Sequence, residues 1–509
     1  MESSPLQLGV FDLLHVIGEG GMGEIWLGVH REQQVKVAIK ILREDQAKQA
    51  KHRQSFLREV QSFARLLHPG IIRIFDYGEI PPELVTTTHS NLTANAPFIA
   101  MELATRGSLA GLSGLVTWRQ LKWMLIEVLN ALAHAHARNL IHRDLKPDNI
   151  LLTEGEGGQT CVKLTDFGIV HISDPAVFKN TSDLSTLYAG TPVYMSPEQL
   201  RGRWRDFGPW TDLYALGCVA FEQACGNLPF EGDNLFDIAH QQLAAELPPF
   251  IPKVNVPQGF EGWVRRLLEK NPQDRFQRAA DAAWALLQLP EPEGEPAENE
   301  GSAQLRSTPL HRISDPGAPT MDDFTLELES EPQHTTQNTL HSDLLSQLGQ
   351  ANLHSSQLDD ATYSEPDRKL FVYKDAPPPP ARWHRRRAPA PSIQLMGAGL
   401  GLYGLREIPF VSRTEERDLC WEMMLEAFRS NTPRAVLIRG STGVGKTRLM
   451  QWLGERAHEV GSAIIMRGYH SPEAPPTQGF SDMIARQLNT GGLSRKKAFD
   501  RIKDILTAS

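Results

Sequence analysis

Residues 142–149 read HRDLKPDN, and the triplet DFG begins at Asp166. The octet places a carboxylate (Asp144), an ammonium group (Lys146) and a carboxamide (Asn149) close together, and Asp166 adds a second carboxylate at the distance that one strand hairpin needs. Phosphoryl transfer requires such groups: a carboxylate that orients the attacking hydroxyl, a cation on the γ-phosphate, and two oxygen ligands for a metal ion on the phosphates. This stretch therefore decides how the rest of the chain is interpreted.

Length and composition indicate a chain of several parts. At 509 residues it is too long for one hydrophobic core, and about three domain-sized units are expected, one of which could be a linker. Hydrophobic residues make up 40% and charged residues 22%, as in ordinary globular protein, whereas 35 prolines and 40 glycines indicate a non-globular stretch. The net charge of −9 argues against a chain that coats nucleic acid.

The cysteines and the N-terminus predict a cytoplasmic protein. The four cysteines show neither metal-ligand spacing nor a dense disulfide framework, so reduced, buried thiols are expected. The start, MESSPLQLGV, lacks the features of a signal peptide, and no run of about 18 apolar residues suggests a membrane span. The most apolar candidate, residues 395–405, is short and holds four glycines. We interpret it as a flexible lead-in rather than a membrane segment.

Residues 10–289 show the pattern of a mixed domain, with β-rich runs first and helical spacing afterwards. Strands are predicted at residues 35–42, 71–80 and 97–103, and helices at residues 46–67, 118–139 and 212–225. The polar residues 81–96 interrupt the first part and are either a surface loop or a docking loop. The expected fold class is α+β, with a small β-rich lobe and a larger helical lobe.

Residues 290–400 are rich in Glu, Pro, Ser, Gln and Thr and are interpreted as a largely disordered linker. Residues 291–367 hold 16 acidic residues and two arginines, so the acidity of the chain is a property of this tether. The prolines at 377–380 favour extended polyproline. The arginines at 382 and 385–387 suit either a phosphate or the acidic tether itself.

A glycine-rich turn and a strand lysine precede the octet. The turn, IGEGGMGEI, contains Gly18, Gly20 and Gly23, and the strand run VAIK ends at Lys40. Alone these signals are weak, but their order with the octet places Lys40 where it could neutralise nucleotide phosphates. Glu59, on the predicted helix at 46–67, is interpreted as the ion-pair partner of Lys40, the alternative being a surface glutamate.

With these motifs in order, residues 10–289 resemble a eukaryotic-type serine/threonine protein kinase of the bacterial kind, with a bilobal fold. The resemblance implies ATP and Mg²⁺ as cofactors and protein serine or threonine hydroxyls as acceptors. It implies that Asp144 handles the hydroxyl proton, Lys146 contacts the γ-phosphate, and Asn149 and Asp166 bind the metal. The adenine pocket would be formed by Ile17, Ile25, Ala38, Met101, Glu102, Ala104 and Leu151, with Met101 as gatekeeper.

The same resemblance extends to the substrate side and to regulation. GTPVYMSPE at residues 190–198 matches the substrate-docking loop, with Ser196 where alanine is usual. Asp212 would hold the catalytic loop, and Arg275 would pair with Glu198. Arg143, before the catalytic aspartate, implies control by phosphorylation of the loop after DFG. The candidate acceptors there are Ser185 and Thr186, then Thr181 and Ser182. Ser108 stands where many kinases have an acidic residue for the ribose.

A second nucleotide site is predicted in residues 401–509. The sequence GSTGVGKT supplies Gly440, Gly443, Gly445, Lys446 and Thr447, which complete GxxxxGK[ST] between a predicted strand at 434–440 and a predicted helix. With FVSRTEERDL upstream, it resembles the opening of AAA or STAND-type ATPases. No apolar strand ending in acidic residues follows, so hydrolysis is not expected there. We interpret the segment as the first part of an NTPase module whose remainder is missing.

Two functions compete at this point. The first is an active serine/threonine kinase tethered to a nucleotide-binding signalling module, which could self-associate for trans-autophosphorylation. The second is a non-catalytic scaffold in which the kinase fold binds partners and the phosphate loop acts as the switch. The second would normally show a lost Asp144, Asp166 or Lys40, and all three are present. We therefore favour the enzyme, with ATP and protein substrates as partners and no nucleic acid.

Overall fold

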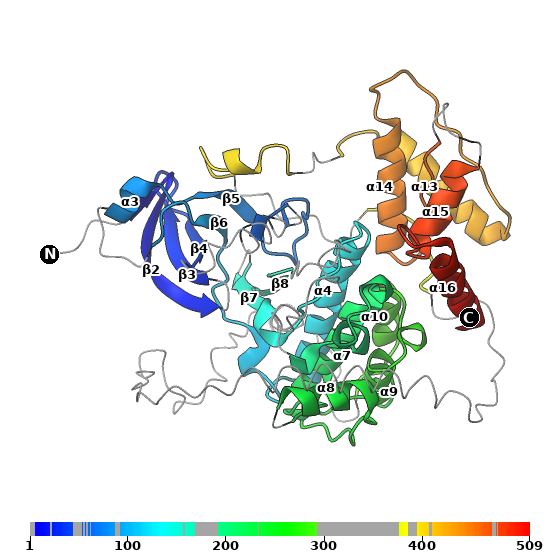
Figure 1. Ribbon diagram of the computed structural model, residues 1–509, viewed down its shortest axis with the longest axis horizontal. Coiled ribbons are helices and arrows are strands. Elements are labelled where there is room, and N and C mark those ends of the chain that lie inside the picture. Colours follow the sequence, from blue (N-terminus) through cyan, green and yellow to red (C-terminus); the bar gives the residue numbers. More distant parts are fainter. Residues whose placement is uncertain are drawn as a thin grey trace. The chain divides into compact units, whose positions relative to one another are not determined.

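The structure is a computed structural model (Figure 1). It describes residues 6–20, 23–43, 53, 56–57, 60–61, 63–86, 92–155, 158–167, 192–232, 234–292, 376–384, 394–406, 410–470, 475 and 477–508. The chain divides into two compact units. The first comprises residues 1–231, 238–309 and 375–465, and the second comprises residues 232–237, 310–374 and 466–509. The domain limits expected from the sequence, 10–289, 290–400 and 401–509, stay predictions.

The β-rich lobe is one antiparallel sheet in the order β1-β2-β3-β4-β6-β5 (Figure 1). Its strands are β1 (Leu6–Leu8), β2 (Phe11–Gly20), β3 (Gly23–His30), β4 (Lys36–Leu42), β5 (Ile74–Glu79) and β6 (Pro97–Glu102). The β-branched run KVAIKIL forms β4 near the centre of the sheet, where most of its side chains are buried. The three predicted strands of this lobe are therefore confirmed.

The region between β4 and β6 contains a helix and an insertion. In the predicted helix at 46–67, the described positions 53, 56–57, 60–61 and 63 are helical, and Phe56, Val60 and Phe63 are buried along one stripe. Positions 64–67 are not helical, so the predicted C-terminal end of this helix is wrong. The insertion starts with α3 (Pro82–Thr86) and ends at Ala96, whose carbonyl accepts a bond from Ile80 N (2.9 Å). Its purpose, surface loop or docking loop, stays open.

The helical lobe is built around α4 (Trp118–His136) and α7 (Pro209–Cys225). Helix α4 begins at a capping box between Thr117 and Gln120, and α7 ends at Gly226 in the left-handed conformation, as helix termini favour. Both predicted helices are confirmed. The other helices of the domain are α6 (Pro197–Leu200), α8 (Leu235–Ala244), α9 (Phe260–Leu267) and α10 (Ala279–Leu287).

A two-stranded hairpin, β7 (Ile150–Glu154) and β8 (Thr160–Leu164), lies between the octet HRDLKPDN and DFG. It joins the lobes because Ile71, just before β5, forms a parallel bridge with Leu164 at the end of β8. The hairpin brings the residues before β7 beside those after β8. The spacing of the two motifs thus has the structural cause expected from the sequence.

The C-terminal part of the first unit contains a short 3-10 turn, η9 (Leu400–Leu402), and the helices α13 (Thr414–Ser430) and α14 (Lys446–Glu459). A small core of Trp421, Leu425 and Ala457 joins the two helices. The predicted strand at 434–440 is wrong: these residues form no strand, and Val436 and Leu437 are 48% and 74% exposed. A strand needs a neighbour for its backbone groups, and the described residues provide none for this segment.

The second unit contains α15 (Gln478–Gln487) and α16 (Arg495–Ala508). Arg501 Nε donates to Leu488 O (2.7 Å), which ties α16 to the end of α15, and the Arg486 guanidinium lies over the Tyr469 ring. Across the described part of the chain, every helix is too short or too polar to span a membrane.

Candidate active site

One face of the sheet in the β-rich lobe carries the residues predicted to contact the nucleotide. In the antiparallel register Ile25 lies opposite Lys40, and Ala38 lies opposite Met101. Directly opposed residues share a face, and so do residues two apart along one strand. Ile25, Ala38, Lys40 and Met101 therefore line the same face, as the predicted adenine and phosphate contacts require. Ile17 lies in β2, the next strand of the sheet.

The glycine-rich turn connects β2 to β3, with Gly20 paired to Gly23. A Cβ atom on Gly23 would lie 2.2 Å from Ile41 O, so only glycine allows β3 to approach β4 at this point. Gly18 lies opposite Ile25 in the same hairpin. Residues 21–22, at the tip, lie outside the described residues.

Lys40 reaches across the site to the DFG aspartate. Its Nζ lies 2.7 Å from Asp166 Oδ1, and the lysine side chain is only 12% exposed. Asp166 adopts a positive φ of 50°, a conformation rare outside glycine that is typical of functional positions. Glu59, the predicted partner of Lys40, lies outside the described residues, so that ion pair stays a prediction.

The octet folds into a compact loop around Asp144. Asn149 Nδ2 donates to Asp144 O (2.7 Å) and to Asp144 Oδ2 (3.0 Å), and Lys146 Nζ lies 3.7 Å from Asp144 Oδ2. Burial raises the pKa of Asp144 above its ordinary value, and the charge of Lys146 opposes that rise. Asp144 is thus the carboxylate of the site whose proton affinity is increased.

Asp212 on α7 fixes the backbone of this loop. Its carboxylate accepts bonds from His142 N and Arg143 N (both 2.8 Å) and from His136 Nε2 (2.7 Å). Burial acts to raise the pKa of Asp212, but the bond from His136 and the neighbouring histidines outweigh it and leave the pKa lowered. Asp212 holds the catalytic loop, as the sequence predicted.

A stack of rings joins the predicted helix at 46–67 to the octet. Phe63 packs edge-on against Phe167 (5.1 Å between centroids), and Phe167 lies 4.5 Å from the His142 ring. His142 is fully buried, which lowers its pKa, and its Nε2 donates to Thr165 O (2.9 Å). The sequence showed Phe63 only as part of a helical stripe and gave no signal for this stack.

Two further contacts lie around the predicted nucleotide pocket. Lys163 Nζ lies 2.7 Å from the carboxylate of Glu102, and Glu102 N donates to Arg73 O (2.8 Å), so the backbone carbonyl is the candidate contact of this residue for a base. Ser108 Oγ accepts a bond from Ala110 N (3.4 Å), so the residue in the ribose position caps a 3-10 turn. Ala104 and Leu151 are partly exposed.

The donor set suits a divalent cation with oxygen ligands. Because Asn149 uses its amide nitrogen on Asp144, its amide oxygen is the atom that can serve as a ligand. With a carboxylate oxygen of Asp166 this makes two hard donors, which Mg²⁺ favours alongside phosphate oxygens and water. Among the described residues no group of three or more His, Cys, Asp or Glu residues suggests a separate metal site.

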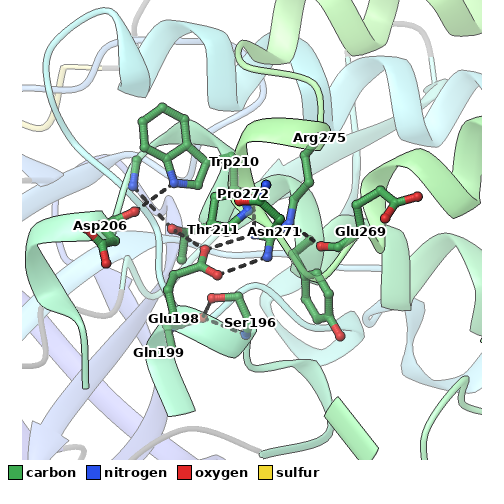
Figure 2. A network of polar contacts seen from close by, with 12 residues as sticks. Ser196, Glu198, Gln199, Asp206, Trp210, Thr211, Glu269, Asn271, Pro272 and Arg275 are labelled. Carbon is green, nitrogen blue, oxygen red and sulfur yellow. Dashed lines mark hydrogen bonds and ion pairs between the residues drawn. The ribbon is translucent and has the colours of Figure 1, made fainter. Parts of the chain in front are cut away.

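The segment that resembles a substrate-docking loop is anchored by a buried ion pair (Figure 2). Arg275 Nη1 and Nη2 lie 2.8 and 2.9 Å from the two oxygens of Glu198, and both side chains are almost fully buried. Thr211 Oγ1 also donates to Glu198 Oε1 (3.0 Å). The predicted pairing is therefore present, and its bidentate geometry ties the loop to α7 and to the segment before α10.

Polar contacts connect this loop to its neighbours. Gln199 Nε2 donates to Arg143 O (2.8 Å), and Tyr194 Oη donates to Glu222 Oε2 (2.7 Å) on α7. Ser196, where alanine is usual, donates from both N and Oγ to Gln199 Oε1 (3.1 Å each). The serine thus holds the glutamine that reaches the catalytic loop. The acceptor candidates Thr181, Ser182, Ser185 and Thr186 lie outside the described residues.

The phosphate-loop motif has the local backbone geometry of such a loop, but the predicted strand before it, at residues 434–440, is absent. Gly443 and Gly445 have φ values of +85° and +89°, and α14 begins at Lys446, followed by Thr447. Lys446 Nζ lies 2.8 Å from both Gly440 O and Ser441 O, so its ammonium group curls over the loop. The loop amides, the helix terminus and the lysine therefore converge on one small region.

Comparison with known proteins agrees with this geometry. Residues 11–285, more than half of the chain, match the protein kinase domain. The chain therefore belongs to the protein kinase family, whose members use ATP and a divalent metal ion. The predicted enzyme class, a serine/threonine protein kinase, is confirmed at the level of family and relatives. The match ends before the phosphate loop, so the resemblance to AAA or STAND-type ATPases gains no support from it.

The relatives are bacterial kinases. The chain is 33% identical over 283 residues to the probable serine/threonine-protein kinase PknB of Bifidobacterium longum, covering 55% of this chain and 39% of that protein. It is 33% identical over 281 residues to the serine/threonine-protein kinase PknA of Mycobacterium tuberculosis, covering 55% and 61%. It is 34% identical over 284 residues to the serine/threonine-protein kinase Pkn1 of Myxococcus xanthus, covering 55% and 38%. The chain thus spans less than two thirds of each relative.

Proposed function

We propose that the chain transfers the γ-phosphate of ATP to serine or threonine hydroxyls of protein substrates. The observation that supports this most directly is the convergence of Asp144, Lys146, Asn149 and Asp166 at the two ends of one hairpin, with Lys40 bonded to Asp166. The four groups that phosphoryl transfer requires, and a second cation for the nucleotide phosphates, therefore lie in one site. Lys146, two positions after Asp144, supports serine and threonine rather than tyrosine as acceptors.

Each residue has a role that follows from its position. Asp144 orients the acceptor hydroxyl and accepts its proton, which suits a carboxylate whose pKa burial has raised. Lys146, beside it, stabilises negative charge on the transferred group. Lys40 neutralises the α- and β-phosphates, and Glu59 is proposed to orient Lys40. Asn149 and Asp166 hold Mg²⁺, which supplies charge neutralisation on the phosphates when it is bound.

The nucleotide is proposed to lie against the sheet face described above. The apolar side chains of Ile17, Ile25, Ala38, Met101 and Leu151 enclose the base, and backbone groups of Glu102 and Ala104 bond to it. Gly18, Gly20 and Gly23 let the backbone approach the phosphates. The engagement of the Glu102 carboxylate by Lys163 supports a backbone role for this residue.

The test is a phosphotransfer assay on the purified chain with Mg²⁺ and labelled ATP. The expected result is label on the chain itself or on a generic acceptor, lost in Asp144→Ala. If the intact chain transfers no label and Asp144→Ala behaves identically, the scaffold function replaces the kinase. The same reaction, followed by phosphopeptide mapping, tests whether Ser185, Thr186, Thr181 or Ser182 is modified. Dependence of the rate on protein concentration would support modification within a self-associated pair.

We further propose that residues 440–447 bind a second nucleotide. The support is the curled Lys446 and the two positive-φ glycines at the start of α14. Titration calorimetry should give two nucleotides per chain, and one in Lys446→Ala. A stoichiometry of one in the unaltered chain would overturn this second site. No hydrolysis is proposed there.

A further inference from the structure

The C-terminal part of the first unit contacts the kinase lobes at two places that the proposed function does not use. The first contact is made by residues 394–406, which we call the strap. Gln33 Nε2 donates to Gln394 O (2.9 Å), and Gln33 Oε1 accepts from Met396 N (2.7 Å). One side-chain amide therefore pairs with two backbone groups of the strap, as a neighbouring strand would. His30 Nε2 adds a bond to Met396 O (2.8 Å).

The other end of the strap binds the edge of the sheet. Arg406 Nη2 donates to Ile74 O (3.0 Å) and to Phe75 O (2.9 Å) on β5, one of the two edge strands of the sheet. The β5–β6 register shifts between Ile74 and Asp76. An edge strand has backbone groups without a neighbouring strand, and the arginine satisfies two of its carbonyls. The two ends of the strap are thus fixed to different strands of one sheet.

The glycines of the strap are required by its close approach to β5. A Cβ atom on Gly401 would lie only 1.8 Å from Tyr77 O, and Gly399 has a φ of +92°. Leu395 and Leu402 are buried, 8% and 1% exposed, on either side of this contact. The interpretation of residues 395–405 as a flexible lead-in is therefore wrong. The glycine-rich composition suggested mobility, whereas Gly401 allows the strap to pack closely against β5.

The second contact is made by the last turns of α14 on the end of α4. Arg138 Nη2 lies 3.2 Å from Glu455 Oε2, and His134 Nδ1 lies 3.3 Å from Glu459 Oε1. Both glutamate side chains are only 8% exposed. A carboxylate buried this far is costly unless a cation faces it. Arg138, just beyond the end of α4, supplies that cation for Glu455, whereas Glu459 also has Arg456 of its own helix at 3.4 Å. The two surfaces are therefore complementary in charge.

We propose that residues 394–406 and 410–465 act as a brace that binds both kinase lobes in cis, through the strap on the β-rich lobe and through α14 on the helical lobe. This inference rests on the proposed function, in which ATP binds between the lobes, so that a segment fixed to both lobes restricts their relative motion. The brace is present together with the closed contact between Lys40 and Asp166. Because it favours this closed arrangement, its release weakens ATP binding in the kinase cleft.

Hydrogen exchange on the full chain tests the strap without any need for kinase activity. The amides of Leu402, Tyr403 and Leu405 donate only within the strap. A turn this short is not stable alone, so protection of these amides reports docking. We expect exchange about tenfold slower than free-peptide rates. Gly401→Val should abolish the protection, and Tyr403→Ala, whose side chain is 91% exposed, should keep it. Free-peptide rates in the unaltered chain would overturn the brace.

A charge-swap cycle tests the second contact of the brace, between α14 and the helical lobe. Arg138→Glu and Glu455→Arg should each raise the KM for ATP in phosphotransfer about fivefold, the lower end of typical intersite coupling, and the double variant should restore it. Single variants with an unaltered KM, or a double variant as impaired as both singles combined, would contradict the proposal. If a swap variant does not fold, Gly401→Val compared with Tyr403→Ala gives the same KM test. Unaltered protection with no kinase activity would contradict the proposed function and leave the strap intact.

Discussion

The catalytic loop and the phosphate loop are both short motifs, but the structure completes them in different ways. Around Asp144, residues from α7, the hairpin β7–β8 and strand β4 converge, and Asp212 fixes the loop backbone through two hydrogen bonds while His136 on α4 holds its carboxylate through a third. Around Lys446 the contacts of the lysine are local, made to Gly440 and Ser441 of the same loop, and one distant side chain, Arg413, donates to Val444 O (2.8 Å). The first site depends on tertiary structure, whereas the second is formed mainly by consecutive residues. Changes that remove one kind of support should therefore have different effects at the two sites.

The largest effect is expected from the catalytic carboxylate. Asp144→Ala removes the group that accepts the hydroxyl proton, so kcat should fall by about three to four orders of magnitude. Steady-state phosphotransfer to a generic acceptor measures it. As a control, Glu261→Gln removes a half-exposed carboxylate on α9 that pairs with Arg265. A fall in kcat below tenfold for Asp144→Ala would remove this residue from the reaction.

The buried ion pair tests the tertiary support of the docking loop. Arg275→Met leaves the Glu198 carboxylate buried without its bidentate partner, so the free energy of unfolding should fall by about 3–5 kcal/mol. Arg265→Met is the matched control, because its pair with Glu261 is more than 40% exposed and should contribute less than about 1 kcal/mol. Urea unfolding measures the free energy of unfolding of both variants. Equal losses of free energy in Arg275→Met and Arg265→Met would contradict the prediction.

The local character of the second site predicts a smaller effect. Lys446→Ala removes one charge-assisted contact to a phosphate and should weaken nucleotide binding there by about 1.5–3 kcal/mol. Calorimetric titration resolves this loss as the weakening of one of the two nucleotide sites, while the other keeps its affinity. Arg429→Ala, a 60% exposed arginine at the end of α13, serves as the control. If both variants lose affinity equally, the effect is one of general charge and not of the loop.

The smallest effect concerns the pH dependence of the catalytic site. Protonated Asp144 cannot accept the hydroxyl proton, and burial raises its pKa, so activity should be lost on the acid side at a higher pH than for an ordinary aspartate. Lys146 opposes this rise, so Lys146→Met should move the acid limb of kcat/KM to still higher pH. Profiles of both proteins between pH 4 and 8, a range suited to carboxylate titration, measure the shift. If the acid limb of Lys146→Met moved to lower pH, the predicted direction of the effect of Lys146 on the Asp144 pKa would be wrong.

The sequence was informative where a motif and its structural role coincide. The order of the motifs singled out the candidate catalytic residues and the strand lysine, and the resemblance to the kinase family implied the loop-holding role of Asp212 and the pair of Glu198 with Arg275. It was uninformative where the role depends on a distant partner. Phe63 was visible only as a helical apolar residue, and its ring contact with Phe167 could not be read from spacing.

Two interpretations failed for the same physical reason. The β-rich run at 434–440 predicted a strand from propensity, but a strand forms only when a neighbour pairs with its backbone. The glycines at 395–405 predicted flexibility, but Gly401 lies against the carbonyl of Tyr77, where any side chain would collide. In both cases the tertiary neighbours of the segment, and not its local composition, decided its structure. Residues 434–440 have no neighbouring strand among the described residues, and residues 395–405 pack against β5.

The sequence by itself determined the class of the fold and the chemistry of the kinase site, because the reacting groups are specified by residue type and by their order along the chain. Tertiary structure decided how those groups are held and what else binds the lobes. The contacts of Asp212, the ring stack on His142 and the strap on β5 join residues far apart in sequence. Such contacts arise from packing and backbone satisfaction, which no short motif encodes.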